Sequence, residues 1–192
     1  DPVLDYDPVG SKIFTESVDQ IIRFLKNKNL ILHLVLETHA HADHLSGAQV
    51  LKRAYPNAKV AISNRITQVQ EIFHDALGLG DDVATDGSQF DVLFEDNAIL
   101  NAGSLKLQGI PTPGHTPACM TYVAGDAAFV GDTMFMPDYG TARADFPGGD
   151  ARVMYRSIQK ILALPDETTL YMCHDYKAPG RDEYKWETTV AE

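Results

Sequence analysis

Apolar and polar positions alternate along the first half of the chain in a way that predicts helices and strands in turn. Residues 17–28 carry apolar side chains at helical spacing, and Ser17 with Gln20 forms the pattern of a capping box, so we expect a helix there. The segment Leu30–Leu36 is almost continuously aliphatic, which predicts a strand buried on both faces. Further elements are expected in this order: a helix over 45–54, a strand over 59–63 and a helix over 65–77. This order favours an α/β layered fold.

The pattern changes to short alternating segments after residue 90. Within 90–110, Asn97 and Asn101-Ala102-Gly103 are turn signals, so we expect hairpins in this stretch. Asp150 is expected to cap a last amphipathic helix. The remaining expectations are strands at 120–123 and 127–130 around a Gly125-Asp126 turn, an irregular stretch over 131–150, a strand over 169–173 and a polar tail over 181–192.

The length of 192 residues suits one domain, which we expect to span residues 1–192. Asp1–Tyr6 resembles the exit from a strand, so we expect the chain to be truncated at one or both ends and to lack an N-terminal hairpin. No apolar run approaches the roughly 20 residues of a membrane-spanning helix, and no signal-peptide pattern is present. The chain is therefore expected to be cytoplasmic.

Charge and cysteine content narrow the classes of partner. The formal net charge of −11 repels phosphate backbones and anionic headgroups, and no basic run overrides it, so we expect neither nucleic acid nor membrane as a partner. Cys119 and Cys173 form no C-x-x-C pair and are expected to be reduced thiols.

Three histidines and an aspartate lie within six residues, directly after the predicted buried strand: His39, His41, Asp43 and His44. Loops at strand ends are where a rigid sheet can direct several side chains at one point. Imidazole together with carboxylate is the ligand set for zinc or non-haem iron. The cluster therefore predicts a metal site.

Three further ligand types each end or follow a predicted strand: His115, Asp132 and His174. Each alone also has a plain structural interpretation as a turn or loop residue. As a spaced set they predict that several strand ends meet at the same metal site. His33 and His74 are expected to stay outside it.

The motif Thr38–His44, followed by isolated His, Asp and His, resembles the metallo-β-lactamase superfamily over nearly the whole chain. The resemblance implies an αββα sandwich with the metal site at one edge between the sheets. By resemblance, the ligands of a first metal are His39, His41, His115 and Asp132. Those of a second are Asp43, His44, His174 and the bridging Asp132.

The stretches Pro113–Cys119 and Thr141–Gly149 resemble the persulfide dioxygenases of that superfamily, and Met136–Gly140 is similar to the bacterial ones. This likeness implies one Fe(II) per chain, and oxidation of glutathione persulfide or a related persulfide by O2 to sulfite and glutathione. The iron ligands would be His39, His115 and Asp132. The catalytic groups around them would orient ligands and hold water, and comprise His41, Asp43, His44, His174 and Asp175.

Other assignments stay open at this point. All seven ligands of a two-metal site are present, so a glyoxalase II-like thioester hydrolase with one or two Zn²⁺ per chain is the alternative, and a non-catalytic metal-binding protein is a third. Arg143 is the candidate for binding the glutathione carboxylates, because a guanidinium binds a carboxylate bidentately, but it can equally pair with Asp145. Tyr176 is a second candidate substrate contact, and family analogy allows a homodimer.

Overall fold

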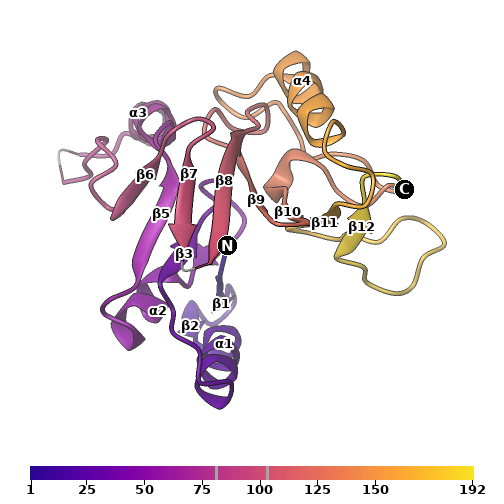
Figure 1. Cartoon of the computed structure of the whole chain (residues 1–192). Helices are drawn as coiled ribbons and strands as arrows, with labels where there is room; N and C mark the ends of the chain where they lie inside the picture. The colour runs from indigo at the N-terminus through magenta and orange to yellow at the C-terminus, as the bar shows by residue number, and fades with distance from the viewer. Residues whose placement is uncertain (81, 103) are drawn as a thin grey trace.

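The chain folds into two facing sheets with helices on their outer sides, in a computed structural model that describes residues 1–80, 82–102 and 104–192 (Figure 1). Its elements, in chain order, are β1 Val3–Asp7, β2 Lys12–Phe14, α1 Glu16–Asn27, β3 Leu34–Leu36, β4 Leu45–Ser46, α2 Ala48–Ala54, β5 Lys59–Ser63, α3 Ile66–Leu77, β6 Val92–Phe94, β7 Ile99–Ala102, β8 Leu105–Pro111, β9 Met120–Ala124, β10 Ala127–Phe129, the short 3-10 helix η1 Gly131–Thr133, α4 Ala151–Ile161, β11 Thr169–Tyr171 and β12 Glu187–Thr189.

The two facing sheets have six and three strands, and a third sheet of three strands includes the N-terminal hairpin. The large sheet has the order β12-β11-β10-β9-β8-β7 and is mixed, since only β10 and β11 pair in parallel. The second sheet, β3-β5-β6, is parallel throughout, and the third has the order β2-β1-β4. This arrangement confirms the predicted α/β fold of the αββα type.

Three layers of apolar contacts hold the sandwich together. Val18 of α1 and Leu51 of α2 pack on Val35 and Val60, on the outer face of the parallel sheet. Between the sheets, Ala61 and Phe94 meet Leu107, Met120 and Tyr122 of the large sheet. On its far side, Ile161 of α4 packs on Ala128 and Leu170. Burial of both faces explains why these strands are rich in aliphatic residues.

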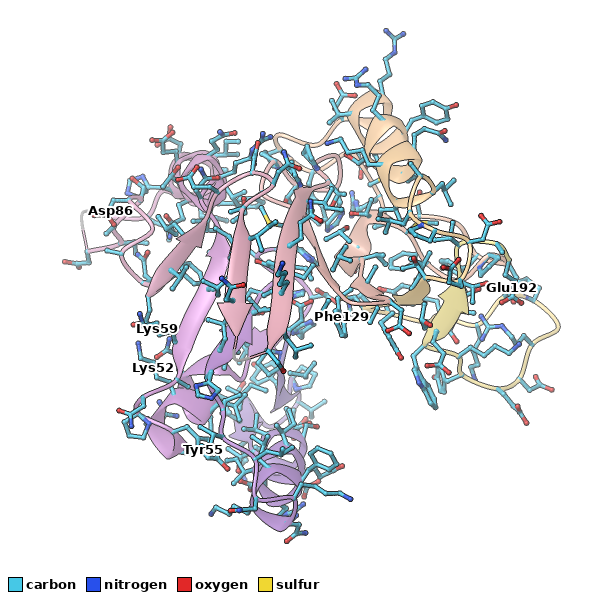
Figure 2. All side chains as sticks on the ribbon, viewed as in Figure 1. Lys52, Tyr55, Lys59, Asp86, Phe129 and Glu192 are labelled. Atoms are coloured by element: carbon cyan, nitrogen blue, oxygen red, sulfur yellow. The ribbon has the colours of Figure 1, made fainter. Side chains whose placement is uncertain are left out.

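An ion pair lies at one end of the parallel sheet. The Asp91 carboxylate accepts hydrogen bonds from Lys52 Nζ at 2.5 and 2.6 Å and from the backbone N–H of Val60 at 2.8 Å. Figure 2 shows Lys52, Tyr55 and Lys59 at this end of the molecule, away from Phe129 on β10. This end of the parallel sheet is therefore polar, and the functional site lies at the opposite ends of its strands.

Several predicted boundaries are wrong, because long-range pairing decides them. The strand expected at Leu30–Leu36 is β3 alone, since only Leu34–Leu36 faces β5, and Ile31 is 76% exposed. The helix expected over 45–54 starts at Ala48, because Leu45 and Ser46 pair with β1 instead. Within 90–110, β7 and β8 form a hairpin as predicted, whereas β6 joins β5 in parallel.

Both termini contain strands that were not predicted. Asp1–Tyr6, interpreted as a strand exit, contains most of β1, which pairs with β2 in a hairpin. In the expected polar tail, Glu187–Thr189 pairs with β11 as β12. The turn expected at 101–103 includes residue 103, which lies outside the described residues.

The cap of α1 is also different from the prediction. Ser17 is inside the helix, and both its N–H and its hydroxyl donate to the Asp5 carboxylate of β1, at 2.8 and 2.6 Å. A side chain from a neighbouring strand thus satisfies the free N–H that the capping box was expected to satisfy. The cap of α4 is confirmed, since Asp150 accepts from the N–H groups of Arg152 and Val153.

We expect Asp150→Ala to lower the free energy of unfolding by about 1 kcal/mol, because it leaves two N–H groups at the start of α4 without an acceptor. Asp150→Asn is the matched control and should stay near wild type, since Asn caps helices as well as Asp. Urea unfolding monitored by circular dichroism measures both. An unchanged midpoint for Asp150→Ala would contradict the assigned cap.

Candidate metal centre

The predicted ligands come together where strand ends of both sheets meet. His39 follows β3 of the parallel sheet, whereas His115, Asp132 and His174 follow β8, β10 and β11 of the large sheet. The two sheets are joined directly at this edge, because Met120 N–H of β9 donates to Thr38 O at 2.9 Å. The edge of the sandwich therefore supplies a rigid frame for a site built from several strands.

Two glycines allow these strand ends to approach so closely. Gly131, at φ +56°, precedes Asp132, and a Cβ there would lie 2.6 Å from Thr38 Oγ1. Gly114, at φ +145°, precedes His115, and a Cβ there would lie 2.4 Å from the Met154 backbone of α4. Both positions require glycine. The positive φ disfavours other residues, and the neighbouring atoms leave no room for a side chain.

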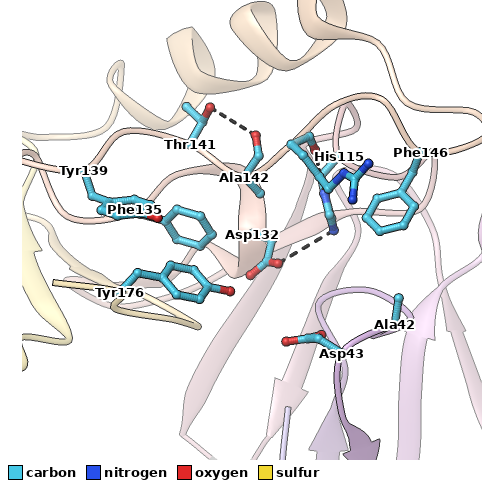
Figure 3. Close-up of a pocket in the computed structure, with 11 residues that line it drawn as sticks. Ala42, Asp43, His115, Asp132, Phe135, Tyr139, Thr141, Ala142, Phe146 and Tyr176 are labelled. Atoms are coloured by element: carbon cyan, nitrogen blue, oxygen red, sulfur yellow. Dashed lines mark hydrogen bonds and ion pairs between the residues drawn. The ribbon is translucent and has the colours of Figure 1, made fainter. Parts of the chain in front are cut away.

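The first group of ligands consists of His39, His115 and Asp132, and all three are buried. Asp132 Oδ2 lies 3.7 Å from the Nε2 atoms of both His39 and His115. Figure 3 shows Asp132 beside His115, with the aromatic side chains Phe135 and Tyr176 on one side and Phe146 on the other. Two imidazoles and one carboxylate thus converge on one point.

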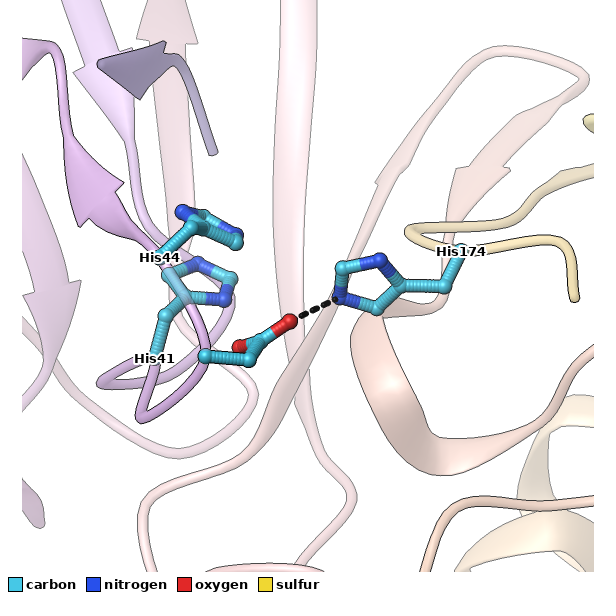
Figure 4. Close-up of side chains that lie close together, drawn as sticks. His41, His44 and His174 are labelled. Atoms are coloured by element: carbon cyan, nitrogen blue, oxygen red, sulfur yellow. Dashed lines mark ion pairs between the residues drawn. The ribbon is translucent and has the colours of Figure 1, made fainter. Parts of the chain in front are cut away.

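The second group consists of His41, Asp43, His44 and His174. Figure 4 shows His41 and His44 on one loop facing His174 on another. His174 Nε2 lies 3.2 Å from Asp43 Oδ2 and 3.7 Å from Asp132 Oδ1. Asp132 therefore directs one oxygen towards each group. His41, assigned to the first metal by resemblance, is grouped here with the second set, and its ring centroid also lies 4.1 Å from that of His39.

Hydrogen bonds on the far side of each ring orient the histidines of the first group. His115 Nδ1 donates to the backbone O of Arg143 at 2.7 Å. Thr38 Oγ1 donates to Asp1 Oδ2, so His39 Nδ1 donates to Thr38 Oγ1 at 3.0 Å. In both rings the Nε2 lone pair is left facing the site, which is how protein groups prepare an imidazole for a metal.

A carboxylate pair that was not predicted holds His41. Its Nε2 lies 3.0 Å from Asp1 Oδ1 and 3.5 Å from Glu37 Oε2, and Glu37 is buried. The sequence signal was a single acid, Glu37, at the end of an apolar strand and four residues before His41. Asp1 gave no such signal, because it joins the site only through the fold.

Burial changes the pKa of two ligands of the first group, His39 and Asp132. Burial, and then the neighbouring imidazoles, lower the pKa of His39 well below its usual value, so this ring is neutral. Burial raises the pKa of Asp132, and the surrounding histidines oppose that effect. Among the described residues, buried atoms without a partner include His41 Nδ1, Asp132 Oδ1 and His174 Nε2. Orphaned donor atoms of this kind fit a bound cation, because iron and zinc take both imidazole and carboxylate.

The other predicted residues lie around this centre in different ways. Arg143 and Tyr176 line a cavity of about 330 Å³ next to His115 and Asp132. Arg143 also forms a bidentate pair with Asp145, at 2.6 and 2.8 Å. Asp175 belongs to neither ligand group, because its carboxylate binds Arg181 instead of a histidine. The catalytic role expected of Asp175 therefore stays a prediction, since its side chain contacts Arg181 in this structure.

Both cysteines are free in the structure. Burial raises the pKa of Cys119 to about 11 and that of Cys173 to about 12, so both are thiols near neutral pH. His33 and His74 stand apart from the ligand groups, as predicted. No helix in the described parts of the chain has the length and apolar character needed to span a membrane.

The family model described as the metallo-beta-lactamase superfamily matches residues 1–174. The chain belongs to this superfamily. It is 50% identical to a probable metallo-hydrolase of Burkholderia pseudomallei and 48% identical to Glyoxylase B2 of Dictyostelium discoideum, covering 100% of this chain and 68% and 66% of those proteins. It is 31% identical to the mitochondrial persulfide dioxygenase ETHE1 of Homo sapiens, covering 92% of this chain and 58% of that protein.

Among solved structures, ETHE1 from Myxococcus xanthus matches with a TM-score of 0.71 and 29% identity, over 98% of this chain and 73% of that one. Such a match confirms the metallo-β-lactamase fold. The chain spans about two thirds of the length of the Burkholderia and Dictyostelium relatives. Together with the ligand groups, the comparisons indicate a metal-dependent enzyme of this superfamily.

We expect Asp132→Ala to reduce metal binding at both ligand groups, because its two oxygens face one group each. Loss of an outer hydrogen-bond partner already costs about 10- to 100-fold in metal affinity, so loss of this ligand should cost more. His174→Ala should weaken the second group and spare the first, and exposed His33→Ala is the control. Metal per chain after dialysis against a weak chelator measures this. Wild-type metal content in Asp132→Ala would contradict the ligand assignment.

Proposed function

We propose that this chain is a mononuclear non-haem iron dioxygenase that oxidises glutathione persulfide, or a related small persulfide, with O2. The observation that carries the proposal is the buried group of His39, His115 and Asp132, whose ligand atoms lie within 4.8 Å of one another. Two histidines and one carboxylate are the ligand set of non-haem Fe(II) oxygenases. A bound Fe(II) supplies the redox steps that O2 requires, whereas Zn²⁺ with its filled d shell cannot.

The reaction balances as persulfide plus O2 plus water giving thiol plus sulfite. The outer sulfur atom loses four electrons, which reduce O2, and the S–S bond breaks so that the inner sulfur leaves as the thiol. Residues of the chain orient the reactants and limit water at the site. His115 is held by Arg143 O, and the aromatic side chains Phe135, Phe146 and Tyr176 form an apolar wall beside it.

Arg143 and Tyr176 are the proposed contacts to the thiol carrier. Arg143 lies at the mouth of the cavity, 4.7 Å above the Phe146 ring, and its guanidinium is exposed. Its present partner, Asp145, is also exposed, so a substrate carboxylate can replace it without burying a charge. Glutathione has two carboxylates and suits such a contact.

A second candidate is a two-metal hydrolase of a glutathione thioester. Two observations favour it. Asp132 faces both ligand groups. The relatives at 50% and 48% identity carry hydrolase or glyoxylase names, and these identities are higher than the 31% identity to the persulfide dioxygenase. By names alone the hydrolase has the better support. The dioxygenase rests on the group of His39, His115 and Asp132, which has the iron ligand set, and on the likeness of Pro113–Cys119 and Thr141–Gly149 to that branch.

Metal loading separates the two candidates. Protein purified without O2 should contain about one iron per chain, since one group has the iron ligand set. It should consume O2 and form sulfite in equal amounts when glutathione persulfide is added. Two zinc ions per chain, with thioester cleavage in the absence of O2, would establish the hydrolase. Bound metal with neither activity would indicate a metal-binding protein without turnover.

Arg143→Lys should raise KM for glutathione persulfide about tenfold while kcat stays near wild type, because an ammonium cannot bind a carboxylate bidentately. Arg152→Lys makes the same change at an exposed position on α4 and serves as the control. Steady-state O2 uptake over a range of persulfide concentrations gives both constants. A wild-type KM in Arg143→Lys would remove Arg143 from the substrate site.

A further inference from the structure

The Arg181 side chain joins two loops that are far apart in the sequence. Its guanidinium donates to Asp138 Oδ2 and Oδ1, at 2.6 and 3.0 Å, and to Asp175 Oδ2 and Oδ1, at 2.5 and 2.7 Å. It also donates to the backbone O of Glu183 at 2.8 Å. Both carboxylates are thus bound bidentately by one planar group, which a lysine cannot reproduce.

Each of these carboxylates immediately precedes a tyrosine that lines the cavity. Asp138 comes before Tyr139, in a turn where the N–H groups of Tyr139 and Gly140 both donate to Met136 O. Asp175 comes before Tyr176, and its carboxylate also accepts from the N–H groups of Lys177 and Lys185. None of Arg181, Asp138 and Asp175 lines the cavity itself. The network therefore lies directly behind the cavity wall.

The two tyrosines form an aromatic cluster with Phe135 (Figure 3). The ring centroids of Tyr139 and Tyr176 are 5.4 Å apart, and Phe135 contacts both rings edge to face. Tyr176 also stacks on His174, at 5.7 Å. The tyrosines are 46% and 53% exposed, so burial contributes little to their placement.

In the described parts of the chain, no strand pairing joins the two loops either. The loop with Tyr176 runs between β11, which ends at Tyr171, and β12, which begins at Glu187. The loop with Tyr139 lies in the irregular stretch between η1 and α4. Among the described residues, the direct side-chain hydrogen bonds between these loops are those of Arg181 with Asp138.

We propose that Arg181 is a positioning residue, which holds the Tyr139 and Tyr176 loops together and so sets the shape of the wall that the substrate contacts. The proposal rests on the proposed function only in taking this cavity as the substrate site. Arg181 acts through the two tyrosines, and the metal ligands of the first group come from other strand ends. Its loss should therefore weaken substrate binding while metal binding at His39, His115 and Asp132 persists.

A first test needs no substrate. Asp138→Asn changes an exposed side chain on one loop, and hydrogen–deuterium exchange is measured on the other, over residues 175–186. If Arg181 couples the loops, exchange at the N–H groups of Lys177 and Lys185 should rise in Asp138→Asn, and rise further in Arg181→Ala. Unchanged exchange over 175–186 in Asp138→Asn would overturn the proposal, whatever reaction the enzyme catalyses.

A second test uses whichever of glutathione persulfide or glutathione thioester the metal-loaded wild type converts. Arg181→Lys and Asp138→Asn should each raise KM about tenfold, with iron per chain unchanged and kcat within about threefold, since binding rather than chemistry is affected. The double variant should be no worse than Arg181→Lys alone, because both remove the same link. A raised KM for Arg181→Lys with a wild-type KM for Asp138→Asn would mean that Arg181 only folds its own loop. A wild type that converts neither substrate would contradict the proposed function and leave the exchange test to decide the role of Arg181.

Discussion

The rest of the site depends on the burial of Asp132 among histidines with no hydrogen-bond partner for its Oδ1 atom. A carboxylate and several imidazoles removed from water are costly unless an opposite charge compensates them. Burial already pushes both groups towards neutrality, raising the pKa of Asp132 and lowering that of His39. A cation at this point satisfies the carboxylate and the lone pairs of the imidazoles together. The sandwich thus provides a poor environment for these groups without a metal and a good one with it.

Much of the metal centre could be predicted because its ligands are concentrated in sequence or stand at strand ends. His39, His41, Asp43 and His44 follow one strand directly, and that clustering is visible without any fold. What could not be predicted is how these residues are distributed between the two ligand groups. His41 Nε2 lies beside the carboxylates of Asp1 and Glu37, and Asp1 is 40 residues away in the chain. Contacts of that separation leave no periodic signal in the sequence.

In the fold too, elements set by local sequence patterns were predicted, whereas elements set by distant strand pairing were not. Lys59–Ser63 was predicted to the residue, and α3 and α4 closely, because their patterns are local and strong. Leu45–Ser46 and Val92–Phe94 were misassigned, because their pairing partners, β1 and β5, lie elsewhere in the chain. β12 was missed because a short polar segment becomes a strand only beside β11. The link from Arg181 to Asp138 has the same character, since 43 residues separate the two.

Gly114 ties the outermost helix layer to the metal centre. Its Cα lies so close to the Met154 backbone that no side chain fits, and the next residue is the ligand His115. Asp150, at the start of the same helix, donates its N–H to Gly114 O. The helix and the ligand therefore cannot vary independently during evolution or protein engineering: a bulkier residue at 114 must push α4 outwards or draw His115 away from Asp132. A helix on the outside of the sandwich thus sets a limit on the coordination chemistry at its edge.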